Sequence, residues 1–179
     1  MSIFNYVPSV TMVDVEADGP IPGEYSMISF GAVVAEQSLS KTFLGLLKPI
    51  SEKFYEEALS ISGYTREQTL TFSDPVEVML SFEGWLEKNS TGRPIFISDN
   101  NGFDFQFVSW YFHKFLGRNP FGWSSRRLPD LYCGMMKDVN SKWKHLRITK
   151  HTHNPVDDAK GNAEVLLKLK EMGLKINLE

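Results

Sequence analysis

The chain has almost no cysteine, no strong excess of either charge and no long hydrophobic run. Its single cysteine, Cys133, cannot form a disulfide within the chain. Together with four tryptophans and seven methionines, this indicates a reducing compartment, and we expect the cytoplasm. The formal net charge of −3 excludes a broadly basic protein that coats nucleic acids. It is compatible with an enzyme that carries a local positive track.

Targeting and membrane-spanning segments are not expected. The first ten residues lack a charged start followed by a long apolar run, so we expect no signal peptide. No apolar stretch approaches the ~20 residues that span a bilayer, so we expect no membrane partner. The 179 residues contain no internal repeat and fit a single domain over residues 1–179.

Four segments have the apolar composition of buried strands. They are Val10–Val15, Met27–Ala35, Thr42–Leu47 and Ile95–Ser98. The first three are separated by short breaks, which indicates an antiparallel meander.

Three helices follow from their end signals and apolar faces. One begins after Asp74, where an N-cap residue precedes a proline at the first helical position. The other two are Phe103–Leu116 and Pro155–Met172. The segment 48–73 is expected to be a loop, and the segment 117–154 is mixed. This order predicts an α/β domain with a mixed sheet flanked by helices.

Two carboxylates stand two positions apart at the end of the first strand. Asp14 and Glu16 therefore point to the same face of that strand. Two buried carboxylates repel each other unless a cation joins them. The alternative is that the strand ends at Val13 and both acids are solvated loop residues.

Other chemically useful side chains stand at helix starts. Asp104 begins the aromatic helix, and His153 and Asp158 straddle the start of the last helix, five positions apart. Each is a weak signal alone, because an acid in a first turn also favours the helix dipole. Their combination with Asp14 and Glu16 is much more specific.

These residues, in this order, resemble the three motifs of the DnaQ-like (DEDDh) exonuclease superfamily. The matching segments are Val13–Gly19, Asn100–Phe107 and His153–Ala159, and the connecting text Glu57–Glu67 is also similar. The resemblance covers Met12 to Leu167. It implies a ribonuclease H-like fold, two divalent metal ions and 3′-to-5′ hydrolysis.

The resemblance also implies a role for each residue. Asp14 would bridge both ions, and Glu16 and Asp158 would hold the ion that binds the attacking water. Asp104 would support the second ion. His153 would be the general base, and its ordinary pKa of ~6.5 suits that role. Oxygen-rich ligands favour Mg²⁺ or Mn²⁺.

A single-stranded 3′ end is best held by stacking and by phosphate contacts. The residues around the motifs that we predict to contact substrate are Ala17, Asp18, Gly19, Ile21, Met27, Asn100, Phe103 and Lys150. The basic stretch Lys142–Arg147, with Arg126 and Arg127, could track the phosphate backbone. The alternative is a solvated charged face with Trp143 packed inward. His151 also precedes the last helix and is the alternative general base.

The sequence therefore predicts a metal-dependent 3′-5′ exonuclease that releases nucleoside 5′-monophosphates from single-stranded nucleic acid. RNA is favoured by analogy with small members such as oligoribonuclease. The alternatives are a DNA exonuclease of the proofreading or repair type and a catalytically silent module that binds nucleic-acid ends. A homodimer formed through the aromatic helix is compatible with the enzyme.

Overall fold

A five-stranded mixed sheet organises the chain in the computed structural model, which describes residues 9–176 and residue 178. Its strands are β1 (Val10–Ala17), β2 (Met27–Val34), β3 (Thr42–Leu46), β4 (Ile95–Ser98) and β5 (Ser125–Arg127). The order is β3-β2-β1-β4-β5, with β1 antiparallel to β2 and parallel to β4. The first eight residues, in which we expected no signal peptide, lie outside the described part of the chain.

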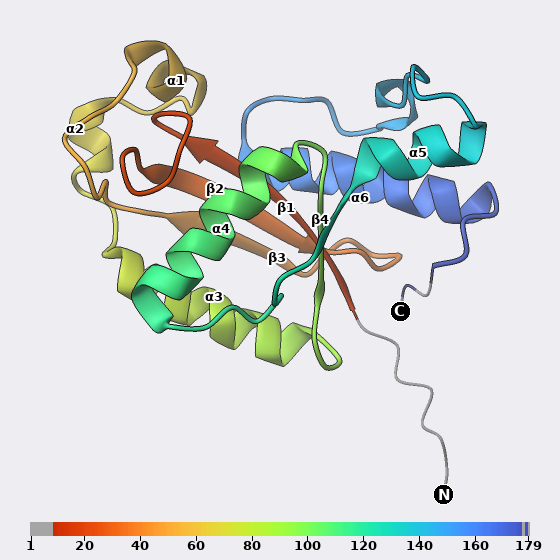
Figure 1. Cartoon of the computed structure of the whole chain (residues 1–179), viewed down its shortest axis with the longest axis horizontal. Helices are drawn as coiled ribbons and strands as arrows, with labels where there is room; N and C mark the ends of the chain where they lie inside the picture. The colour runs from red at the N-terminus through yellow and green to blue at the C-terminus, as the bar shows by residue number, and fades with distance from the viewer. Residues whose placement is uncertain (1–8, 177, 179) are drawn as a thin grey trace, which may run out of the picture.

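Helices cover both faces of the sheet (Figure 1). They are α1 (Glu56–Ile61), α2 (Arg66–Thr69), α3 (Pro75–Asn89), α4 (Asn101–Leu116), α5 (Leu128–Met136) and α6 (Pro155–Glu171), with a 3₁₀ turn at Lys144–Leu146. One apolar cluster joins the sheet to α3 and α4, and a second joins it to α5 and α6. Within residues 9–176, no helix is long and apolar enough to cross a membrane.

The central strand β1 divides its side chains between the two clusters. Val13 and Val15 belong to the cluster under α3 and α4, whereas Met12 belongs to the cluster under α5 and α6. Successive side chains of a strand alternate between faces. Asp14 and Glu16 therefore continue the row of Met12 and face the side on which α6 lies.

The start of α6 rests directly on β2. Gly31 is opposite Asp14 in the strand register, and a Cβ on Gly31 would lie 2.2 Å from the carbonyl carbon of Pro155. The helix is entered through Asn154, whose side chain accepts a hydrogen bond from the Val156 amide. The missing side chain at position 31 thus lets the first turn of α6 approach the carboxylates of β1.

The predicted fold class is confirmed, with differences at the element level. β1 continues to Ala17, so the alternative that it ends at Val13 is wrong. The segment 48–73, expected to be a loop, contains α1 and α2. The mixed segment contains β5 and α5. The β5 sequence Ser-Arg-Arg has no apolar pattern because it is an edge strand with two exposed side chains.

Aromatic side chains of α4 fill the core. Phe107 and Tyr111 are fully buried, and Trp110 packs against the same cluster. The Tyr111 hydroxyl accepts a hydrogen bond of 2.8 Å from the backbone amide of Met27. These rings therefore pack inside the protein and do not form an exposed surface for a partner. The homodimer stays a prediction, which light scattering would test.

Candidate active site

Four carboxylates meet where β1 ends and where α4 and α6 begin, and we call them the acid cluster. They are Asp14, Glu16, Asp104 and Asp158. Asp14, Glu16 and Asp158 each offer an oxygen, and these oxygens lie within 4.8 Å of one another. Asp104 approaches from the start of α4, where its Oδ1 accepts a hydrogen bond of 3.2 Å from the Val15 amide.

Burial and mutual repulsion raise the pKa of three carboxylates of the acid cluster. Burial, followed by the charge of Asp104, raises the pKa of Asp14 well above its usual value. Burial and the charge of Asp99 raise the pKa of Asp104 in the same way. Burial also raises the pKa of Glu16 to about 7, although His153 opposes this shift. A cation among these oxygens would favour the ionised carboxylates and so oppose all three shifts.

The residues fit a divalent metal ion. The Oδ2 atom of Asp104 is buried and has no hydrogen-bond partner in the described part of the chain. A buried carboxylate oxygen without a partner is costly, and a cation satisfies it. The cluster offers only carboxylate oxygens, which are the donors that Mg²⁺ and Mn²⁺ prefer.

The pKa of Glu16 predicts how a metal ion should change stability with pH. The folded pKa of about 7 lies above the ordinary value of 4.5. The proton on Glu16 therefore stabilises the metal-free fold fully below pH 4.5, and this contribution is lost as the pH rises through 7. Asp14 and Asp104 act in the same direction. We expect Mg²⁺ to raise Tm more at about pH 8 than at about pH 5.5, by roughly 2–4 °C for each kcal/mol of binding free energy.

This prediction is tested by thermal melts with Mg²⁺ or with EDTA at both pH values. The Asp14→Asn variant is the control, because its cluster has lost one of the charges that the cation would neutralise. An equal gain in Tm at both pH values in the original chain would show that protons and metal do not compete at the acid cluster.

The Asp158 carboxylate accepts three hydrogen bonds and lies beside His151. Its Oδ1 accepts from Arg147 Nη2 at 2.9 Å and from the Thr152 amide at 3.2 Å. Its Oδ2 accepts from the His153 amide at 2.9 Å and lies 2.6 Å from His151 Nδ1. The His151 side chain is 42% exposed, whereas the three donors are backbone amides and a buried guanidinium. The His151 ring is therefore the neighbour that can move aside when Asp158 binds a cation.

Both histidines stand at the entrance to the acid cluster. His153 Nδ1 is 3.6 Å from Glu16 Oε1, and its side chain is 50% exposed. The two imidazole rings are 4.4 Å apart, so His151 lies on the Asp158 side and His153 on the Glu16 side. His153 has a φ of 61°, a left-handed conformation that His tolerates better than most residues. His151, Asp158 and His153 also form a second group with the spacing of metal ligands.

The loop that carries the histidines is anchored on α6. The Arg147 side chain is 6% exposed and donates hydrogen bonds to Asn162 Oδ1 and to the Thr149 carbonyl. A Cβ on Gly161 would lie 2.5 Å from the guanidinium, so the glycine makes room for it. Glu164 accepts hydrogen bonds from the Thr149 amide and hydroxyl. The prediction that Arg147 belongs to a phosphate track is therefore wrong, because its charge is buried against Asp158.

A cavity of about 290 Å³ adjoins Glu16. Its lining residues are Glu16, Ala17, Gly19, Pro20, Tyr55, Ala58, Ile61 and Phe103. Three predicted substrate contacts, Ala17, Gly19 and Phe103, are thus brought together beside the acid cluster. Ile21 is 46% exposed and lies outside this lining. Tyr55 and Ile61 come from α1 and its entry, a segment that we expected to be a loop.

The remaining predicted substrate contacts divide by exposure. Asn100 and Lys150 are exposed, at the entry to α4 and in the histidine loop. Asp18 and Met27 are fully buried, so their side chains cannot touch a nucleic acid strand and this part of the prediction is wrong. The hydrophobic effect places Met27 in the core.

Asp18 is a structural anchor. Its Oδ2 is 3.0 Å from Arg66 Nη1, and its Oδ1 accepts a hydrogen bond from the Ser26 amide. Arg66 also donates to the Ser51 carbonyl and lies over the Phe54 ring, 4.9 Å from its centroid. This pair ties the loop after β1 to α2.

Breaking this pair should destabilise the fold. We expect Asp18→Ala to lower the free energy of unfolding by about 3–5 kcal/mol, because it leaves the largely buried Arg66 without its partner. Urea denaturation measures the change. The double variant Asp18→Ala/Arg66→Ala should lose less than the sum of the single losses. Strict additivity would show that the two charges do not act as a pair.

The mixed sheet with helices on both faces and an acid cluster at the strand ends define a nuclease of ribonuclease H-like fold. The chain is 34% identical over 180 residues to the "3′-5′ DNA exonuclease Cap18" of Escherichia coli, covering 93% of this chain and 94% of that protein. No protein-family model matches. This chain belongs to the DEDDh family of 3′-5′ exonucleases, and it is a hydrolase.

Solved structures agree with this fold. The nuclease domain of 3′hExo, a DEDDh family member bound to rAMP, superposes with a TM-score of 0.76 and 17% identity over 98% of both chains. The zinc-bound form of the E. coli ExoI–ssDNA complex has a TM-score of 0.72 and 16% identity, covering 93% of this chain and 41% of that one.

Proposed function

We propose that the chain, as a single domain over residues 1–179, removes nucleotides one at a time from the 3′ end of single-stranded DNA and releases nucleoside 5′-monophosphates. The observation that carries this proposal is the convergence of four carboxylates and two histidines beside a largely apolar cavity. The relative at 34% identity, which is a DNA exonuclease, supports DNA over the RNA that the sequence alone favoured.

The acid cluster would hold two divalent cations, Mg²⁺ or Mn²⁺. Asp14, Glu16, Asp104 and Asp158 are their proposed ligands. When bound, the cations supply charge stabilisation for the attacking and leaving oxygens of the phosphodiester. His153 accepts the proton of the attacking water, because its ring is at the entrance and faces Glu16.

The cavity would hold the terminal nucleoside. Phe103 offers an aromatic face, and Ala17 and Gly19 form a small-residue wall beside Glu16. Stacking on an aromatic ring is tolerant of sequence, which suits an enzyme that must accept every base in turn. Ile21, Asn100 and Lys150 would contact the nucleotides nearest the cavity.

The test is a time course with 5′-labelled DNA and RNA of one sequence, each with Mg²⁺ or Mn²⁺. We expect a ladder that shortens by one nucleotide at a time, with DNA consumed faster than RNA. Faster hydrolysis of RNA would assign the RNA-trimming function instead. If both strands stay intact under all conditions, the chain is a module that only binds nucleic-acid ends.

A further inference from the structure

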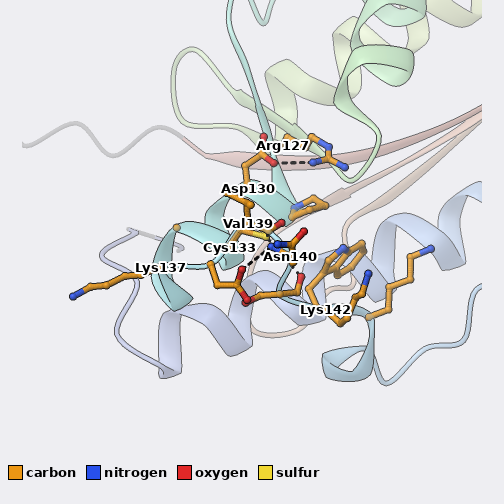
Figure 2. A pocket seen from close by; sticks show the side chains of 13 residues that line it. Arg127, Asp130, Cys133, Lys137, Val139, Asn140 and Lys142 are labelled. Carbon is orange, nitrogen blue, oxygen red and sulfur yellow. Dashed lines mark hydrogen bonds and ion pairs between the residues drawn. The ribbon is translucent and has the colours of Figure 1, made fainter.

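A wide cleft lies outside the acid cluster. It has a volume of about 750 Å³ and runs between α5 and the segment 137–144. Figure 2 places Arg127 at one end and Lys142 at the other, with Asp130, Val139 and Asn140 between them. The cleft also includes Lys137 and Lys144. We call it the lysine cleft.

The lysine cleft carries free positive charge. Lys137, Lys142 and Lys144 are exposed, and none has an acidic partner among the described residues. Asp130 pairs with Arg127 at 2.7 Å, so these two charges of the lining offset each other. Asp138 accepts hydrogen bonds from the Asn140 amide and the Ser141 hydroxyl, which are neutral donors, so the lining keeps one carboxylate charge against three lysines. The three ammonium groups therefore remain available to an anion.

The shape of the cleft is fixed by the protein itself. The Cys133 thiol donates to the carbonyls of Val139 and Ser141, which ties the loop to α5. Trp143 is only 7% exposed, so it packs inward and supports the loop from below. The Val139 side chain is 86% exposed and presents an apolar surface between the charges. A binder of this cleft therefore meets separated cations on either side of an apolar patch.

One end of the lysine cleft lies at β5, which β4 separates from β1 in the sheet. Arg127 of β5 is the register partner of Ser98 of β4. Asp99 directly follows β4, and its charge adds to burial in raising the pKa of both Asp14 and Asp104. The cleft thus starts at the second strand from β1, on the same side of the sheet order as β4.

We infer that the lysine cleft binds the phosphodiester backbone of the substrate strand upstream of its 3′ end. This inference rests on the proposed function. Three separated ammonium groups suit a polyanion better than a single phosphate, because each can neutralise a different phosphate of one strand. The exposed Val139 suits the apolar face of a base or sugar. The cleft would therefore determine how affinity grows with strand length.

The test uses the variant Lys137→Gln/Lys142→Gln/Lys144→Gln. We expect KM for a DNA strand of about 20 nucleotides to rise roughly tenfold or more, while kcat/KM for a dinucleotide stays unchanged. The slope of log affinity against log salt should become shallower by about 2, since each phosphate contact on a single strand contributes ~0.7. Fluorescence anisotropy of labelled DNA on the metal-free protein measures this slope without any hydrolysis.

The matched control is Lys48→Gln/Lys88→Gln/Lys114→Gln, which removes the same charge from exposed positions outside the cleft. This control should keep the original slope and KM. An equal loss in both variants, or no loss in the cleft variant, would overturn the inference. Because anisotropy reports binding alone, a chain that binds through the cleft but hydrolyses nothing would contradict the proposed function and not the cleft.

Discussion

Replacing Asp14 by asparagine is expected to lower kcat on single-stranded DNA by roughly a thousand-fold or more, because the lost charge acts directly on the reaction centre. Burial raises the pKa of Asp14, and the charges of the neighbouring carboxylates raise it further. Removing one like charge relieves repulsion in the metal-free protein, so we expect Tm in EDTA to stay equal or rise. Single-turnover hydrolysis and thermal melts measure the two effects separately.

The matched control is Asp157→Asn. Asp157 stands next to Asp158 in the first turn of α6 but does not belong to the acid cluster. We expect this variant to keep activity within a few-fold, because it removes one carboxylate charge from a position outside the acid cluster. Near-normal turnover by Asp14→Asn would remove Asp14 from the reaction centre.

His153→Ala is expected to reduce kcat by about 10²–10⁴-fold, the usual contribution of a general base. His151→Ala should cost less than about tenfold, because its ring lies beside Asp158 and does not face Glu16. Single-turnover rates of both variants on the same DNA, at one pH and saturating Mg²⁺, measure the two losses. The pH is held fixed because the pKa of Glu16, raised to about 7 by burial, makes the acid cluster itself sensitive to pH.

A second substitution separates chemistry from backbone conformation at this position. Asparagine tolerates the left-handed conformation that His153 adopts, so His153→Asn keeps the loop and removes the base. It should be as inactive as His153→Ala. If His151→Ala instead shows the large loss while His153→Asn stays active, His151 is the base.

The residues brought together at the acid cluster were predictable because their three motifs resemble those of a known superfamily in their order along the chain. Local pattern contributed one part, since alternation along a strand places Asp14 and Glu16 on one face, whereas Asp104 and Asp158 were weak signals by themselves. The structure adds that the face is the one covered by α6, which depends on the packing of whole elements. Local patterns carry no information on that choice.

The contacts of Arg147 with α6 and of Asp18 with Arg66 were not predictable from the sequence. They join residues that are far apart in the chain and that belong to no recognisable motif. Arg147 and the exposed Lys142 are basic residues of the same stretch, and nothing in the sequence shows that only Arg147 is buried. The space left by Gly161 explains why the Arg147 guanidinium can be buried. Asp18 looks like a loop acid, yet its partner Arg66 is 48 positions away. Pairing of this kind is decided by tertiary geometry, so a residue's type alone does not reveal it.

The bare backbone at Gly31 has a consequence for how activity can be lost. Gly31 of β2 lies beside Asp14 of the first motif and directly contacts the main chain of Pro155, next to the third motif. No side chain at position 31 separates the two, so this contact sets the distance between the motifs. A single added methyl group at position 31 would force the α6 start outwards and would carry Asp158 away from Asp14 without altering any polar atom. A screen for folded but inactive variants should therefore find substitutions of Gly31 as well as of the acid cluster. Such variants would keep every catalytic group but hold Asp158 too far from Asp14.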